Sequence, residues 1–181
     1  MSSDELQELQ EHAEHAKHDP GLAPVSLTMA VLAVLVAVVS LMGHRAHTEE
    51  VVLQAKASDQ WAYYQAKDIR QHTDDLFTDL TSVTPATDPA MLAKLRDKYS
   101  QEVARYKDER KEIGDRAHEL EAEVKKERGR ADRFDLAEVF LEIGLVITSI
   151  TLLSGRRIFW TLGLVLGAAG MVVAATAFMI H

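Results

Sequence analysis

The sequence predicts an all-α integral membrane protein, with three transmembrane helices and a long antiparallel coiled-coil hairpin between the first and the second. Apolar residues collect in three blocks, whereas charged residues, which make up 27% of the chain, fill the remainder. Between the first two blocks, apolar residues recur at alternating steps of three and four. This spacing is typical of helices that pack as a coiled coil.

Composition excludes several classes of function. The formal net charge of -8 argues against a nucleic-acid partner, because phosphate binding needs clustered Lys and Arg. The chain has no cysteine, so it has neither disulfides nor thiolate metal sites nor a Cys nucleophile. It also lacks a P-loop, a nucleophile elbow and a dinucleotide fingerprint. We therefore expect neither an enzyme nor a cofactor.

Residues 1–20 form an acidic tail that can fold as a short amphipathic helix. His12, His15 and His18 are three residues apart, so their imidazoles lie on adjacent turns, where Zn or Ni could bind. The spacing matches no zinc-enzyme motif. A solvated, pH-responsive surface is the competing interpretation, and metal or pH sensing is therefore a further alternative function.

Residues 21–43 are predicted to be the first transmembrane helix. No charged residue occurs in this block, and its core from Val25 to Met42 covers about 27 Å as a helix, close to the thickness of a bilayer core. The acidic leading tail, the length of the block and the lack of a cleavage site argue against a signal peptide. We expect a permanent anchor.

Residues 44–135 are predicted to form the helical hairpin, with its tip at residues 81–88. Thr48 is the expected cap of the first hairpin helix, and Asp88 before Pro89 is a typical start for the second. The expected seam of the first helix has a seven-residue spacing, interrupted by Asp59 and Thr73: Val52, Ala55, Ala62, Ala66, Ile69, Leu76 and Leu80. The stripe of the second helix is Leu92, Leu95, Tyr99, Val103, Tyr106, Ile113, Ala117, Leu120, Val124, Ala131 and Phe134. The alanines of the first helix are too small to bury the larger apolar residues of the second helix in a two-helix hairpin. We therefore expect further copies of the chain to cover them, as a homo-oligomer.

Residues 136–153 and 158–180 are predicted to be the second and third transmembrane helices, joined by a tight turn at Ser154-Gly155. Lys and Arg residues near the membrane ends favour a cytoplasmic middle domain, whereas Arg156 and Arg157 in the short loop point the other way. The predicted partners are therefore the lipid bilayer and other copies of the chain.

Glu138 and Glu142 lie one turn apart in the second transmembrane block, so they share a helix face. Glu142 is about 16 Å from the edge of the block near Arg156, close to the bilayer midplane. One interpretation is an ion or proton site. The other is that Glu138 lies among the headgroups, while Glu142 hydrogen-bonds across an oligomer interface as a neutral acid.

Two further groups are candidates for interactions. Gly163, Gly167 and Gly170 would let another helix approach the third transmembrane helix closely. Trp61, Tyr63 and Tyr64 cluster on the first hairpin helix, where aromatic residues usually pack against a partner helix, although a ligand pocket is the sharper alternative.

Three segments, HAEHAKHDP from His12, KASDQWAYYQAKDI from Lys56 and RFDLAEVFLEIGLVITSITLL from Arg133, resemble a family of small bacterial membrane proteins known only as a domain of unknown function. The resemblance implies a bacterial membrane origin and assigns no activity. We expect a multi-pass protein of the inner membrane. The predicted function is a structural or interaction protein, a homo-oligomeric scaffold with a projecting coiled-coil stalk. The alternative is an ion or proton conductor that uses Glu142 and Glu138.

Overall fold

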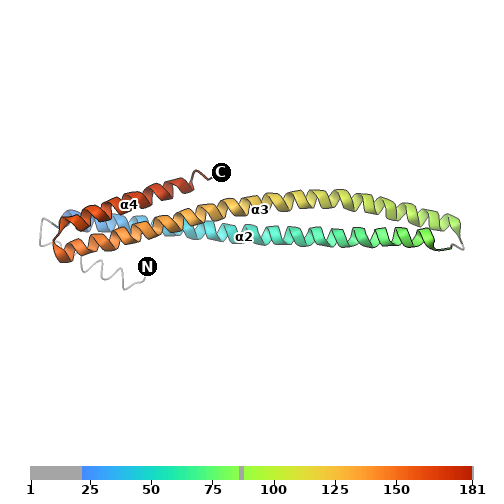
Figure 1. The fold of residues 1–181 in the computed structure, drawn as a ribbon, viewed down its shortest axis with the longest axis horizontal. Helices are drawn as coiled ribbons and strands as arrows, with labels where there is room; N and C mark the ends of the chain where they lie inside the picture. Colours follow the sequence, from blue (N-terminus) through green and yellow to red (C-terminus); the bar gives the residue numbers. More distant parts are fainter. Residues whose placement is uncertain (1–21, 86–87, 181) are drawn as a thin grey trace. The chain divides into compact units, whose positions relative to one another are not determined.

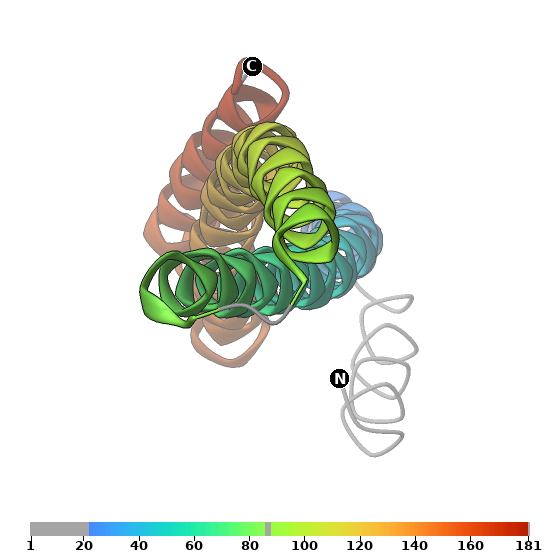
Figure 2. The same ribbon diagram turned by 90° about the vertical axis from the view of Figure 1, so that its right-hand side faces the viewer.

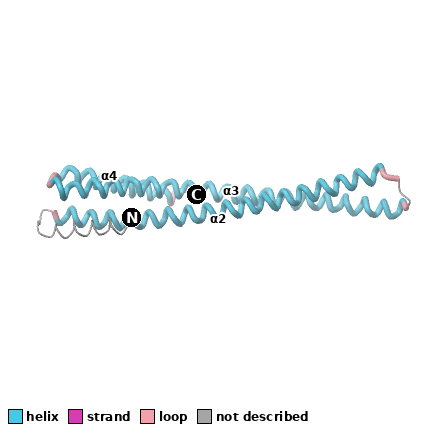
Figure 3. Tube along the Cα trace, turned by 90° about the horizontal axis from the view of Figure 1, so that it is seen from below, coloured by secondary structure: helices cyan, strands magenta, loops and turns pink. Residues whose placement is uncertain are grey.

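The computed structural model describes residues 22–85 and 88–180, and this part of the chain is all-helical (Figures 1 and 3). Three long helices follow one another: α2 (Ala23–Val83), α3 (Pro89–Ser154) and α4 (Arg157–Ala177). Each contains a stretch that is long and apolar enough to cross a membrane. To this extent the predicted fold class is confirmed.

Thr48 does not cap a helix as predicted, because α2 runs from the first apolar block into the charged region without a break. The Thr48 hydroxyl donates a hydrogen bond to the carbonyl of His44, 2.8 Å away, as it does within a continuous helix. Likewise, α3 passes from the charged region into the second apolar block without interruption. No proline interrupts either transition, so the helical hydrogen bonds continue.

Local signals accompany both chain reversals. Asp88 caps α3, because its carboxylate accepts hydrogen bonds from the backbone N–H groups of Ala90 at 3.0 Å and Met91 at 3.1 Å. Gly155 follows the last residue of α3 with a φ of 66°, a left-handed conformation that glycine adopts without steric cost.

The chain divides into two compact units. The first, the three-helix unit, contains residues 22–48 and 126–180 of the described chain. Its core takes residues from all three helices, and Leu141 and Phe134 of α3 are among the most buried of them. Many apolar side chains of the same helices remain exposed, among them Leu27, Val34 and Val146, which suits a lipid environment.

The second, the hairpin unit, contains Glu49–Lys125. Its parts of α2 and α3 run antiparallel and lie side by side (Figure 1, and end-on in Figure 2). A small apolar cluster joins Leu53 and Ala57 to Leu120 and Val124. Further along the pair, the contacts become aromatic and polar: the rings of Phe77 and Tyr99 stack, and two ion pairs join the helices, Lys67 with Glu109 and Arg110 with Asp68.

The seam expected for the first hairpin helix is wrong, because those residues are exposed. The inner face of α2 is offset from them and also steps by four and three: Leu53, Ala57, Gln60, Tyr64, Lys67, Gln71, Asp74 and Thr78 are buried or half-buried. The predicted stripe of the second helix faces inward as expected, with Ile113, Ala117, Leu120 and Val124 buried. Both faces of α2 have the same period, so the period alone did not identify the inner one.

Candidate functional site

Close packing of α3 against α4 depends on glycines from both helices. A Cβ atom at Gly163 would lie 2.7 Å from the carbonyl oxygen of Gly144, and one at Gly170 would lie 2.9 Å from that of Ala137. Because backbone atoms cannot turn aside as side chains do, these two positions exclude larger residues. Two of the three glycines expected to pack helices closely, Gly163 and Gly170, therefore lie where α4 approaches α3.

Two buried threonines of α3 lie near this contact. The Thr148 hydroxyl donates a hydrogen bond to the carbonyl of Gly144 at 2.7 Å, which satisfies it within its own helix. The Thr151 hydroxyl is buried and has no hydrogen-bond partner among the described residues. Thr148 also limits the space at Gly163, because a Cβ there would clash with its hydroxyl.

The contact between α2 and α4 has two parts. A Cβ atom at Gly167 would lie 2.6 Å from a methyl carbon of Leu32, so the absent side chain leaves room for that leucine. Trp160 donates a hydrogen bond from Nε1 to the Thr28 hydroxyl at 3.0 Å. Sequence reasoning missed this pair, because a tryptophan near a membrane edge is more commonly an interfacial anchor.

Glu142 is exposed on α3, and Glu138 one turn earlier is half-buried. Within the described part of the chain, no hydrogen bond or ion pair reaches either carboxyl group. Val139 and Val146, both exposed, flank Glu142 on the same face. Glu142 is about 18 Å along the helix axis from Ser154, the last residue of α3, so its carboxyl lies in the middle of the apolar stretch.

A polar contact lies at the start of the same stretch. His47 on α2 places Nε2 3.0 Å from a carboxylate oxygen of Asp135 on α3. Asp135, Glu138 and Glu142 follow at steps of three and four, so they share one helix face. The step from Asp135 was visible in the sequence, but its contact with His47 depends on how the two helices pack.

The aromatic residues of the hairpin unit pack differently from one another. Trp61 lies edge-to-face with Tyr64 and with His118, and its Nε1 donates a hydrogen bond to Glu121 at 2.9 Å. Tyr64 occupies the space that Gly114 leaves, since a Cβ there would lie 3.3 Å from its ring. Tyr63 is half exposed, and the ammonium group of Lys67 lies over its ring. Trp61 and Tyr64 therefore both contact α3 from α2.

Two polar contacts shift pKa values in the same region. The hydrogen bond from Trp61, followed by that from His118, lowers the pKa of Glu121. The hydrogen bond with Glu109 raises the pKa of Lys67, because it favours the charged ammonium form. The Trp61–Glu121 and Lys67–Glu109 hydrogen bonds both join α2 to α3. Charged groups therefore contribute to the contact between the two helices, in addition to buried apolar residues.

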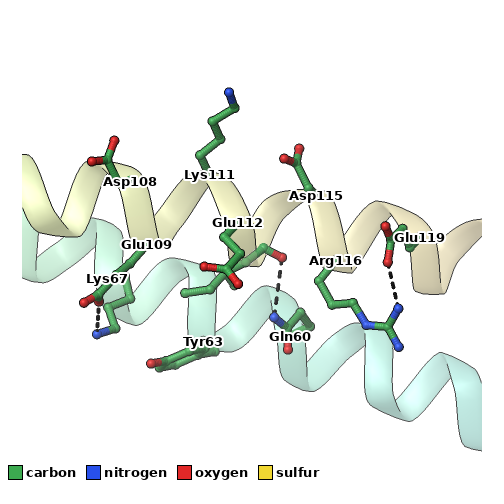
Figure 4. Close-up of a pocket in the computed structure, with 11 residues that line it drawn as sticks. Gln60, Tyr63, Lys67, Asp108, Glu109, Lys111, Glu112, Asp115, Arg116 and Glu119 are labelled. Carbon is green, nitrogen blue, oxygen red and sulfur yellow. Dashed lines mark hydrogen bonds and ion pairs between the residues drawn. The ribbon is translucent and has the colours of Figure 1, made fainter.

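A groove of about 770 Å³ runs between the helices of the hairpin unit beside Tyr63 (Figure 4). Its side chains carry five carboxylates and three cations, and Lys67 and Arg116 are each paired with a carboxylate. Asp108, Lys111 and Asp115 point away from α2. Charges of both signs line the groove and half of them are paired, which matches no single ligand chemistry, so the groove does not support the alternative of a ligand pocket.

The proposed metal ligands His12, His15 and His18 lie outside the described residues. Among the residues that the structure does describe, no group of three or more His, Asp or Glu side chains is placed to hold a metal ion.

The helices and their contacts define a class of protein: an all-helical chain with three helices suited to crossing a membrane. Within this class, the chain belongs to the family described as a domain of unknown function (DUF4337), whose model matches residues 21–180. The family membership expected from the sequence is thus confirmed. No curated protein and no solved structure matches the chain.

Proposed function

We propose that this protein is a homo-oligomeric scaffold of the bacterial inner membrane. In this proposal, its three apolar stretches cross the bilayer, and the hairpin unit is a coiled-coil stalk on the cytoplasmic side. The Lys and Arg residues between Lys125 and Arg133 support that orientation. The observation that carries the proposal of self-association is Glu142, an exposed carboxyl group in the middle of the apolar stretch of α3.

A lone chain leaves this carboxyl group in contact with lipid. Insertion scales put the cost of an ionised side chain near the bilayer centre at about 2.5–3.5 kcal/mol, and lipid tails offer no hydrogen-bond partner. A second copy supplies one, because the same face of its α3 presents another carboxyl group at the same depth. Two neutral acids can each donate to and accept from the other. Self-association along this face therefore removes the unsatisfied group.

An ion or proton conductor is the second candidate, and one specific observation favours it. His47, Asp135, Glu138 and Glu142 place titratable groups in sequence from the edge of the apolar stretch to its middle. Neither of the other two apolar stretches contains an Asp, Glu, Lys or Arg side chain between its ends. The acidic residues of each copy therefore lie along one helix only, without charged partners on the other two. This favours the scaffold over the conductor.

Cross-linking through the face of Glu142 tests self-association. In the cysteine-free chain, Val146→Cys lies one turn from Glu142 and should form a disulfide-linked dimer in lipid nanodiscs. In that background, Glu142→Gln keeps a hydrogen-bonding group and should leave the yield unchanged. Glu142→Leu should weaken association by about 0.6 kcal/mol, roughly a threefold loss in the association constant. A monomer at all protein-to-lipid ratios would contradict the scaffold.

Liposome flux separates the scaffold from the conductor. We expect no proton or cation flux from the wild-type protein across a range of pH values and membrane potentials. A wild-type current that Glu142→Gln abolishes, with cross-linking through Val146→Cys intact, would show that the carboxyl group conducts. That result would replace the scaffold with the second candidate.

A further inference from the structure

A mainly apolar, exposed stripe lies on the outside of the hairpin unit. We call it the outer seam, and it follows α2 with alternating steps of three and four: Val52, Ala55, Asp59, Ala62, Ala66, Ile69, Thr73, Leu76, Leu80 and Val83. All ten residues are exposed, including Ile69 at 67% and Leu76 at 69%. At about 1.5 Å per residue, the outer seam is roughly 46 Å long.

The outer seam is separate from the face of α2 that packs on α3. Its residues lie roughly 150° around the helix from Leu53, Ala57 and Gln60, at about 100° per residue. Single exposed apolar residues are common on protein surfaces, but a strict heptad stripe of this length is the pattern of a coiled-coil interface. The part of α2 in the hairpin unit thus carries two heptad faces, and the described residues of the chain cover only one.

We propose that the outer seam pairs with the outer seam of a second copy, as a parallel coiled coil in register. This inference rests on the proposed homo-oligomer and names the surface that would join its stalks. Copies inserted in one membrane share one orientation, so their α2 helices run in the same direction. Each copy also leaves the bilayer at the same residue, which brings every outer-seam residue level with its own equivalent.

The residues beside the outer seam are compatible with this pairing. A parallel coiled coil pairs flanking residues five positions apart between copies. Along the middle of the seam, none of these pairs brings together two like charges: Ser58 with Tyr63, Gln65 with Arg70, and His72 with Phe77. The alanines within the first half of the seam also allow the two backbones to approach closely.

Asp59 is the one charged residue of the outer seam. In register, it would face the Asp59 of the second copy, and like charges across a coiled-coil seam oppose association. A polar residue at one seam position commonly fixes register and partner number at a cost in stability. Replacing Asp59 with an apolar residue should therefore strengthen pairing, whereas replacing an apolar seam residue with a charged one should weaken it.

Disulfide formation by the full chain in nanodiscs tests the inference. Ile69→Cys and Leu76→Cys lie in the outer seam and should oxidise to a dimer at least about ten times faster than Ser82→Cys, because only level seam positions come within disulfide reach. Ser82 is the matched control, since it is exposed on α2 near the same end but lies off the seam. The product should have twice the mass of one chain.

Two substitutions sharpen the test without disturbing the inner face. Leu80→Asp should reduce the dimer formed through Leu76→Cys at least about fivefold, and Asp59→Leu should increase it. Equal oxidation at Ser82→Cys and Leu76→Cys would overturn the inference, as would a product that contains a different protein. If Val146→Cys cross-links and Leu76→Cys does not, the oligomer stands and the outer seam is not its interface. If neither cross-links, both proposals fail.

Discussion

Trp61 shows how one side chain joins the two helices of the hairpin unit. Its ring contacts Tyr64 and His118, while its N–H group donates to Glu121. The hydrogen bond stabilises the ionised carboxylate, which is why the pKa of Glu121 falls below its usual value. A carboxylate with a lowered pKa stabilises the fold above its unfolded pKa, and this contribution is lost as the pH falls through the folded pKa.

Trp61→Phe should therefore raise the pKa of Glu121, because the ring remains but the donor is lost. NMR titration of the Glu121 side chain measures this change directly. Tyr63→Phe is the control, since the Tyr63 ring contacts Lys67 instead of Glu121. Acidification should also destabilise the Trp61→Phe protein less than the wild type. An unchanged Glu121 pKa in Trp61→Phe would contradict the role given to this hydrogen bond.

Close helix packing in the three-helix unit depends on those glycines whose missing side chain would clash with the backbone of a neighbouring helix. Gly163 and Gly144 bring α4 and α3 together where no side chain fits between them. Gly129 differs, because a Cβ there would meet only Ile180 at 3.7 Å, an ordinary contact. The same residue type thus serves close packing at one position and has no packing requirement at the other.

Gly163→Ala should destabilise the protein by about 1–3 kcal/mol, because the added methyl group forces α4 away from α3. Gly129→Ala should be neutral or stabilising by up to about 1 kcal/mol, because alanine favours the helix. Thermal unfolding of both variants in the same detergent compares them. Equal melting temperatures for the two variants would show that α4 does not pack on α3 as described.

At the scale of the whole molecule, the number of membrane crossings fixes where the chain ends lie. Three apolar stretches, if each crosses once, place residues before the first and after the last on opposite sides. The absence of cysteine makes this arrangement simple to test, because any introduced thiol is the only one in the chain.

Single cysteines at Ser2, Ser82 and His181 should react with a membrane-impermeant maleimide in a fixed pattern. One crossing lies between Ser2 and Ser82, so these two positions should label from opposite faces of the membrane. Two crossings lie between Ser82 and His181, so these two should label from the same face. Labelling of Ser2 and His181 from one face would contradict three crossings.

The sequence by itself determined that the chain is helical and where it reverses direction. Pro85 and Pro89 with the Asp88 cap, and Gly155 after Ser154, are local signals that act through the backbone of a few residues. The apolar stretches are equally local, because hydropathy is a property of composition. The inner stripe of α3 in the hairpin unit was also predictable, since the large apolar residues of that part repeat mainly on one face.

Tertiary structure alone decided which face of α2 packs on α3. The helix has two stripes of the same period, and the inner one is selected by partners on α3, including Glu121 for Trp61 and Glu109 for Lys67. Those partners are about 40–60 residues away in the chain, beyond the reach of any local pattern. The same holds for the exposure of Glu142 and for the contact of His47 with Asp135, because both depend on how separate helices pack against one another.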